Sequence, residues 1–394
     1  MATIHYIDEQ TMSGKRVILR VDFNVSMNPN YTIADDERIR QAVPTIKLLL
    51  QNKNKLVIIS HLNRPKERND HDSLSIVCQK LQEYIPDYTV KLISDFQTEN
   101  PQTFTNQTEK EVFVLENIRF YPEEKKNDPV FAQQLAKLGE VFVNDAFGVS
   151  HRPDTSVVGL PPLMPAYGGL LMKKEIEMIT RAITNPQKPV VAILGGAKIS
   201  SKINLIGKLM DIADYLLIGG GIANTFFCAQ GFQIGKSFCQ YDEAENARRI
   251  LFQAAQSHTR LVLPTDAVVG VPEDMENGGQ IVNAQQIPPE KQILDIGPDT
   301  QAQFGSIIAT AKTIIWNGPV GYFENQEYRR GTDFIYYSIA HNADCISIVG
   351  GGDTLAAISK KEYLGKITHI STGGGAMLEF IENGTLPGIE ALKQ

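Results

Sequence analysis

Short runs of apolar and β-branched residues recur along the whole chain. They are Arg16–Val21, Leu56–Ile59, Val112–Leu115, Val141–Val143, Val190–Leu194, Tyr215–Ile218, Leu261–Leu263, Thr313–Trp316, Cys345–Val349 and Thr368–Ser371. Most are continuous rather than alternating, which is typical of parallel strands buried on both faces. Stretches with helical periodicity lie between them, such as Ile46–Leu50, Pro129–Leu138, Ile203–Ala213 and Glu243–Ala255. This alternation predicts an α/β fold of doubly wound, Rossmann-like parallel sheets.

The pattern is interrupted near the middle of the chain. Three prolines (Pro161, Pro162, Pro165) and the pair Gly168–Gly169 come first, a helical stretch at Leu170–Thr184 follows, and Asn185-Pro186 ends it. We interpret this stretch as a helix that joins two lobes with a cleft between them. Earlier in the chain, Pro44 lies inside a helical stretch, so we expect that helix to begin near Pro44 or to kink there.

Composition and charge narrow the class of protein. A chain of 394 residues is expected to form two domains, since domains usually have about 100–200 residues. The net charge of −7 argues against a general nucleic-acid binder, which would normally show a basic face. The N-terminus lacks the pattern of a signal peptide, and no apolar run approaches the ~18 residues of a membrane span. We therefore expect a cytoplasmic protein.

Four cysteines (Cys78, Cys228, Cys239 and Cys345) are scattered along the chain without a C-x-x-C pair. We expect them to be small buried hydrophobic residues in a reducing compartment, rather than disulfide partners or zinc ligands. The seven histidines show no metal-binding spacing.

Polar and charged residues follow the predicted strands of the first half. They are Asp22 and Asn24, then Ser60, His61 and Arg64, then Glu116, Asn117 and Arg119, then Asn144, Asp145, His151 and Arg152. Ligands of open α/β sheets bind outside the carboxyl ends of the strands. With Arg38, four arginines would gather there, and the guanidinium fork suits phosphate and carboxylate oxygens. This predicts a site for an acidic, phosphorylated metabolite.

Glycines follow the strands of the second half. They are Gly195–Gly196, Gly219–Gly221, Gly350–Gly352 and Gly373–Gly375. Glycine lets the backbone approach a ligand closely, and helix amides behind it can bind phosphate. Lys198 and Lys202 follow the first pair, and Asp353-Thr354 follows the third group. This half is therefore interpreted as a nucleotide site.

Each of these features has a plainer explanation. A single arginine is usually a solvated surface charge, Lys198 and Lys202 could form an exposed helix face, and His61 could be a satisfied buried histidine. The segment Gly231–Ser237 resembles a P-loop but is one residue too short between its glycines, so we treat it as chance. The functional interpretation is favoured because the same arrangement repeats at nearly every strand end.

Ten segments together resemble the phosphoglycerate kinase family over essentially the whole chain. They are Arg20–Val25, Ser60–Pro65, Leu115–Phe120, Asn144–Arg152, Leu194–Ile203, Gly219–Phe226, Asp295–Thr300, Trp316–Glu324, Gly350–Thr354 and Ser371–Ala376. None is decisive alone, but ten in this order are very specific. The sequence departs from the family at Ser26–Asn30, at Asn63, where glycine is usual, and at Thr265, where valine is usual. Asn63 tolerates a left-handed backbone best after glycine.

The resemblance implies a role for particular residues. It implies a 3-phosphoglycerate site formed by Asp22, Phe23, Asn24, Arg38, His61, Leu62, Asn63, Arg64, Arg119 and Arg152. It implies a nucleotide site formed by Lys198, Lys202, Glu324, Gly351, Gly352, Asp353 and Thr354, with Asp353 holding Mg²⁺ beside ATP or ADP. The catalytic residues it implies are Arg38, Lys202 and Gly374.

The resemblance also implies the organisation and the reaction. Residues 1–170, with a tail at about 377–394, are expected to bind 3-phosphoglycerate or 1,3-bisphosphoglycerate; 171–185 form the interdomain helix, and 186–376 bind the nucleotide. The enzyme is expected to be a monomer without nucleic-acid or membrane partners. The attacking carboxylate or phosphate oxygen is already ionised, so the reaction needs positioning and electrostatic stabilisation rather than a general base. Arg38 and Lys202 are expected to flank the phosphoryl group when the two lobes close.

Two alternatives stay open from the sequence. One is another small-molecule or acyl-phosphate kinase on a similar frame. The other is a non-catalytic ligand-trapping protein with two α/β lobes. The second would require a signal peptide and would leave the glycine-rich half without a purpose.

Overall fold

The computed structural model describes residues 3–10, 12–272, 279–358 and 361–393. The chain forms two compact units, Met1–Glu177 together with Thr385–Gln394, and Met178–Gly384. The division falls inside helix α5 (Leu170–Thr184), whose bounds are those predicted. Ten C-terminal residues thus belong to the first unit, a shorter tail than the one expected from the sequence.

The first unit contains a six-stranded parallel sheet with the order β5-β6-β4-β1-β7-β8. Its strands are β1 (Arg16–Arg20), β4 (Lys55–Ile59), β5 (Thr89–Ile93), β6 (Glu111–Leu115), β7 (Val141–Asn144) and β8 (Ala166–Gly168). A short antiparallel pair, β2 (Ser26–Met27) and β3 (Ile33–Asp35), stands apart from it. The helices are α1 (Glu37–Gln51), α2 (Ser75–Tyr84), α3 (Pro101–Thr105), α4 (Pro129–Ala136) and α13 (Pro387–Glu390).

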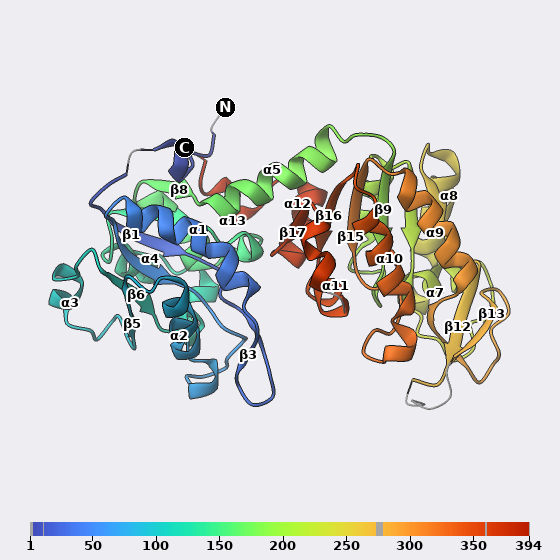
Figure 1. Cartoon of the computed structure of the whole chain (residues 1–394), viewed down its shortest axis with the longest axis horizontal. Coiled ribbons are helices and arrows are strands. Elements are labelled where there is room, and N and C mark those ends of the chain that lie inside the picture. The colour runs from blue at the N-terminus through green and yellow to red at the C-terminus, as the bar shows by residue number, and fades with distance from the viewer. Residues whose placement is uncertain (1–2, 11, 273–278, 359–360, 394) are drawn as a thin grey trace. The chain divides into compact units, whose positions relative to one another are not determined.

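Helices cover both faces of this sheet, so its strands have apolar residues on both sides. Val17 and Leu19 pack in one core with residues of α1 and α2, whereas Ile18 packs in a second core with α4. In Figure 1, α1 and α2 lie along the sheet of this unit. Burial on both faces explains why the central strands are continuous apolar runs.

The second unit has a matching six-stranded parallel sheet with the order β11-β10-β9-β15-β16-β17. Its strands are β9 (Val190–Leu194), β10 (Tyr215–Ile218), β11 (Arg260–Val262), β15 (Thr313–Asn317), β16 (Ile346–Gly350) and β17 (His369–Ser371). A separate antiparallel sheet contains β12 (Asp266–Gly270), β13 (Gln280–Asn283) and β14 (Gln292–Ile296). The helices are α6 (Ile203–Met210), α7 (Gly220–Ala229), α8 (Ala244–Gln256), α9 (Pro298–Thr310), α10 (Arg330–His341), α11 (Gly352–Ala357) and α12 (Gly374–Asn383).

Local chemistry sets several helix ends. The carboxylate of Asp128 accepts the backbone amides of Val130 and Phe131, and Pro129 occupies the first helical position of α4. Both features favour the start of a helix, because they satisfy or remove amides that lack a partner there. Gly384 ends α12 with a left-handed backbone (φ +72°), a conformation that glycine adopts without steric cost.

The predicted α/β fold with two parallel sheets is confirmed, and each of the ten predicted strands is present. One expectation was wrong in part: α1 begins at Glu37, well before Pro44, and continues through it. The segment that resembles a P-loop is a connection whose Ser237 Oγ accepts the amide of Ile293 at 2.8 Å. Only Cys78 of the four cysteines is buried, so that expectation was wrong for the other three.

Among the described residues, no helix is both long and apolar enough to cross a membrane.

Candidate functional site

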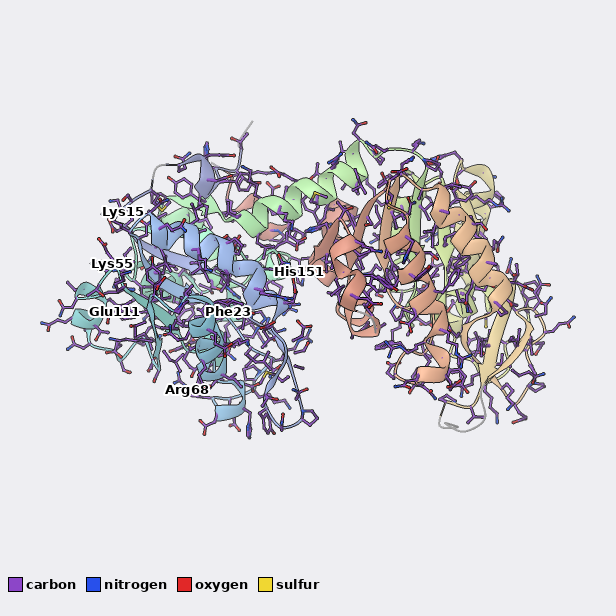
Figure 2. The ribbon with its side chains drawn as sticks, viewed as in Figure 1. Lys15, Phe23, Lys55, Arg68, Glu111 and His151 are labelled. Atoms are coloured by element: carbon purple, nitrogen blue, oxygen red, sulfur yellow. The ribbon has the colours of Figure 1, made fainter. Side chains whose placement is uncertain are left out.

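The strand order of the first unit changes direction at β1, which has β4 on one side and β7 on the other. Such a switch point is where open α/β sheets bind ligands. Figure 2 shows Lys15, Lys55 and Glu111, at the amino ends of β1, β4 and β6, on one side of this unit, and Phe23 and His151, beyond the carboxyl ends of β1 and β7, on the other. The predicted acid-binding residues therefore share the carboxyl edge.

Asp22, directly beyond β1, is the centre of this edge. Its carboxylate forms an ion pair with the guanidinium of Arg38 on α1 and lies 3.8 Å from Nδ1 of His61. Burial alone would raise the pKa of the Asp22 carboxyl, but Arg38, His61 and Arg20 together outweigh burial and hold that pKa below its ordinary value. Asp22 therefore stays ionised at neutral pH and holds Arg38 against the sheet edge.

His61 is buried beside a buried arginine that the sequence analysis did not single out. Nη2 of Arg20 lies 3.4 Å from Nδ1 of His61, and Nε of Arg20 donates to Ser156 Oγ at 2.8 Å. Burial lowers the pKa of His61 well below its ordinary value, so the imidazole is neutral. Arg20 could have been found from the sequence because it is a charged residue directly after the apolar run Val17–Leu19.

Arg119 and Asn63 lie together farther along the edge. Nη1 of Arg119 donates to the carbonyl of Asn63 at 2.5 Å, and the Asn63 amide donates to Asn24 Oδ1 at 2.7 Å. Asn63 has a left-handed backbone (φ +55°), which is the conformation its replacement of glycine suggested. Burial, together with the cation of Arg152, lowers the pKa of Arg119 to about 10, so Arg119 keeps its charge at neutral pH.

The remaining predicted residues of this edge have fewer contacts with the residues around Asp22. Arg152 is partly exposed, and its Nε lies 3.3 Å from Nε2 of His151. Arg64 is exposed. Phe23 and Leu62 are fully buried, so only their backbones can face a ligand; the Phe23 amide already donates to Ser60 Oγ at 2.8 Å.

The second unit has its own switch point at β9, between β10 and β15. The glycine loops beyond these strands pack backbone against backbone: the Gly196 amide donates to the Pro319 carbonyl at 2.7 Å. A Cβ on Gly195 would lie 2.1 Å from that carbonyl oxygen, and Gly318 has a φ of +91°. Glycine is required here because any side chain would separate the loops.

Lys202 lies at the start of α6 and reaches back over this edge. Its Nζ donates to the Gly195 carbonyl at 2.7 Å. Burial lowers the pKa of Lys202 to about 8, and the carboxylate of Asp353 acts in the opposite direction. Lys202 and Asp353 are therefore close in space although 151 positions separate them in the sequence.

The other glycines are also brought to this edge. Oγ1 of Thr354 accepts the Gly318 amide at 2.7 Å and donates to the Gly350 carbonyl at 2.9 Å. A Cβ on Gly374 would lie 3.0 Å from Cα of Gly351. The Thr354 hydroxyl thus ties the Gly318 and Gly350 segments together, and the backbones of Gly351 and Gly374 pack closely beside them.

Two predicted nucleotide residues are not joined to this group. Lys198 and Glu324 are both exposed, the first in the loop after β9 and the second in the loop after β15.

The carboxylates near the second edge show whether this edge suits Mg²⁺. Within the described ranges, no cluster of three or more His, Cys, Asp or Glu side chains is arranged to hold a metal. Asp353 is an exposed carboxylate beside Lys202. One carboxylate fits Mg²⁺ that is bound mainly by nucleotide phosphates and water, because Mg²⁺ commonly takes only one or two protein carboxylates.

Two parallel-sheet units, one with arginines and the other with glycines and a lysine at the carboxyl edge, define a phosphotransferase of α/β fold. The family profile described as Phosphoglycerate kinase matches residues 7–384. A phosphoglycerate kinase of Pelotomaculum thermopropionicum is 43% identical over 391 residues, covering 99% of this chain and 98% of the relative. A relative from Nicotiana tabacum named "Phosphoglycerate kinase, cytosolic" is 43% identical over 390 residues, covering 98% and 97%.

A solved structure agrees with these relatives. The phosphoglycerate kinase of Coxiella burnetii superposes with a TM-score of 0.87 at 38% identity, covering 99% of this chain and 98% of that one. The chain belongs to the phosphoglycerate kinase family. It is an enzyme that transfers a phosphoryl group reversibly between 1,3-bisphosphoglycerate and ADP, giving 3-phosphoglycerate and ATP in glycolysis. The predicted family and reaction are confirmed, and both alternatives are excluded.

Proposed function

We propose that the first unit binds the phosphoglycerate and the second unit binds the nucleotide. The observation that carries this division is the contrast between the two carboxyl edges. Arg38, Arg119 and Arg152 lie at the first, and the packed glycines with Lys202 lie at the second. Within this scheme residues 1–170 and the C-terminal tail form the acid-binding domain, 171–185 join the domains, and 186–376 form the nucleotide-binding domain.

The chemistry of the ligands supports the first half of this division. A phosphoglycerate carries a carboxylate and a phosphate, and the arginine fork can donate two hydrogen bonds to either group. Asp22, Asn24 and His61 supply acceptors or neutral polar groups for hydroxyl groups, because Asp22 is ionised and His61 is neutral. Arg64 is exposed and free to reach a ligand from the loop beyond β4.

Nucleotide binding in the second unit follows from the backbone. Gly351, Gly352 and Gly374 expose main chain that a polyphosphate can approach closely. The buried Thr354 supports this main chain through its hydroxyl. Lys202 and Lys198 supply cations, and Glu324 supplies an acceptor suited to a ribose hydroxyl. Asp353 would hold Mg²⁺ on the phosphate oxygens, where the metal neutralises charge during transfer.

The proposed catalytic groups are the side chains of Arg38 and Lys202 and the backbone of Gly374. Neither side chain has to move a proton, since the carboxylate and phosphate oxygens that attack are already ionised. Each cation instead balances charge on the phosphoryl group as it passes between oxygens. Direct transfer requires the two ligands to meet, so we propose that the two units close on each other and exclude water.

We also propose that the enzyme acts as a cytoplasmic monomer, without nucleic-acid or membrane partners. The cytosolic name of the tobacco relative supports the location. The net charge of −7 supports the lack of a nucleic-acid partner.

Calorimetry on single variants tests the division of ligands. Arg119→Ala should weaken 3-phosphoglycerate binding and leave Mg-ATP binding as it is, because Arg119 belongs to the first unit. Lys202→Ala should do the reverse. A variant that loses both ligands equally, or the wrong one, would contradict the division.

A further inference from the structure

Two of the four cysteines, Cys228 and Cys239, lie side by side in the second unit. The two thiols interact with each other, and Cys239 also lies beside Thr225. Cys228 lies on the last turn of α7, and Cys239 in the loop before the short helix η8 (Tyr241–Glu243). Both were expected to be small buried residues, but each is partly exposed.

Backbone contacts on both sides of Cys239 hold it against α7. The Asn224 side chain donates to the Phe238 carbonyl at 3.2 Å, and the Gln240 amide donates to Thr225 Oγ1 at 3.2 Å. Asn224 and Thr225 are four and three positions before Cys228, so all three share one face of the helix. The proximity of the two thiols is therefore built into the fold around them.

Gln240, the residue after Cys239, contacts the loop of the same unit that carries Lys198 and Lys202. Nε2 of Gln240 donates to Ser200 Oγ at 2.9 Å, and Oε1 of Gln240 accepts the Ser200 amide at 3.0 Å. Ser200 stands between Lys198 and Lys202, and the Lys202 amide donates to the Ile199 carbonyl at 2.8 Å. A shift of the chain at Cys239 would thus move Gln240 and loosen the loop that carries both lysines.

We propose that Cys228 and Cys239 form a redox-sensitive thiol pair, which small disulfides such as oxidised glutathione convert reversibly into an intramolecular disulfide. We propose in addition that this bond weakens nucleotide binding through Gln240 and Ser200. The second part rests on the proposed nucleotide site. The first part does not depend on that site.

The chemistry balances in two exchange steps. The Cys228 thiolate attacks one sulfur of oxidised glutathione; a mixed disulfide forms, the glutathione S–S bond breaks, and one glutathione leaves and takes a proton. The Cys239 sulfur then attacks Cys228 in the mixed disulfide, loses its proton and releases the second glutathione. The two protein thiols are oxidised by two electrons, and one oxidised glutathione is reduced to two thiols.

The order of the two steps follows from the environment of the thiols. Burial, with a further contribution from the Cys228 thiol, raises the pKa of Cys239 to about 12. Cys239 therefore stays protonated at neutral pH and is a poor first nucleophile, since the thiolate is the reactive form. Cys228, which also contacts the hydroxyl of Tyr241, is the thiol that attacks first.

The full-length protein incubated with oxidised glutathione, then alkylated and digested, tests the first part. We expect a peptide pair linked through Cys228 and Cys239, a mass lower by about 2 Da, and full reversal by dithiothreitol. Cys239→Ser should stop at a glutathione adduct on Cys228. The matched control Cys345→Ser should behave like the wild type. Absence of the linked peptides in the wild type, or equal adducts on Cys228 and Cys345, would overturn the pair.

Kinetics of the same samples test the second part. Oxidised wild type should show a several-fold higher KM for Mg-ATP than reduced wild type, whereas Cys228→Ser should be insensitive to oxidation. An unchanged KM in protein with the disulfide formed would overturn the coupling. Reduced Lys202→Ala separates the two ideas: if it also leaves this KM unchanged, the assignment of the loop with Lys198 and Lys202 to the nucleotide fails instead.

Discussion

Arg38 and Asp22 show how one ion pair prepares the acid-binding edge. The Asp22 carboxylate is almost completely buried and bound to Arg38, whose side chain is 31% exposed. The buried carboxylate keeps its charge because Arg38, together with His61 and Arg20, offsets the cost of burial. Arg38 is thereby held in place before a substrate arrives, and part of its surface stays available.

We expect Arg38→Ala to abolish most of the activity without unfolding the protein. In the proposed mechanism the variant removes a cation from the transferring phosphoryl group, and the loss of one such contact lowers kcat by about 10²–10³. Arg40→Ala is the matched control, because Arg40 is exposed on the same helix and forms an ion pair with Glu37. Steady-state kinetics with circular dichroism check both. A kcat for Arg38→Ala within about tenfold of wild type would remove Arg38 from the catalytic role.

The lowered pKa of Lys202 predicts that the use of the nucleotide depends on pH. Its pKa in the free enzyme is lowered to about 8 by burial, so the cation is present below that pH and is lost as the pH rises through it. The kcat/KM for Mg-ATP, which reports the free enzyme, should fall across this range. Lys208→Ala, an exposed lysine of α6, should keep the same profile. A profile that stays level through about pH 8 would contradict the role of Lys202.

At the scale of elements, the start of α5 depends on a glycine. Oδ1 of Asp145 accepts the Met172 amide at 3.0 Å, and Thr45 Oγ1 accepts the Leu170 amide at 3.0 Å. A Cβ on Gly169 would lie 2.2 Å from Oδ1 of Asp145. The carboxylate could not keep both its position and the helix amide, so the beginning of the helix would have to shift.

Two glycine substitutions should therefore change stability in opposite directions. Gly169→Ala should destabilise the protein by about 1–3 kcal/mol through overpacking. Gly207→Ala should stabilise it by about 0.5–1 kcal/mol, because Gly207 is inside α6 with open space around it. Urea denaturation measures both. Equal shifts in the two midpoints would show that the contact between Gly169 and Asp145 is not tight.

The buried carboxyl of Asp145 also predicts how acid affects stability. Burial raises its pKa to about 6 in the folded protein, from an ordinary value near 3.8. The folded state thus binds this proton more tightly than the unfolded state, and its contribution is present at low pH and lost as the pH rises through about 6. Asp145→Asn should remove this part of the pH dependence of the unfolding free energy. The same slope in that variant would assign it to another group.

The elements that could be predicted from the sequence are those buried on both faces. Strands such as β9 and β15 are completely buried and appear as unbroken apolar runs. The missed strand β5 is partly exposed and alternates. Antiparallel β12 pairs with β13 outside the main sheet, and β13 is mostly exposed. Their pattern reflects pairing partners that no local window contains.

The site was predictable to a similar extent. Strand-end residues such as Asp22 and Lys202 could be found because topology brings all strand ends to one edge. The contacts that hold them could not, since Arg20 with His61 and Lys202 with Asp353 are pairs distant in sequence. For the same reason, the neighbourhood of Cys228 and Cys239 was invisible before the fold was known.

For the whole chain, the proposed division of the ligands between the two units predicts that the units close on each other. Small-angle scattering should show a smaller radius of gyration when 3-phosphoglycerate and Mg-ATP are both bound than with either alone. Closure is expected with both ligands because the phosphoryl group can pass only when the two ligands meet. Arg38→Ala should reduce the change. A radius that both ligands leave unchanged would contradict closure of the two units.

We infer that this enzyme phosphorylates 3-phosphoglycerate with a nucleotide that Lys202 helps to bind. The decisive experiment is a coupled assay with purified protein, Mg-ATP and 3-phosphoglycerate, in which the 1,3-bisphosphoglycerate formed is reduced with NADH. We expect turnover that requires magnesium, disappears in Lys202→Ala and persists in Lys208→Ala. Folded wild-type protein without turnover, or a Lys202→Ala variant with undiminished turnover, would contradict it.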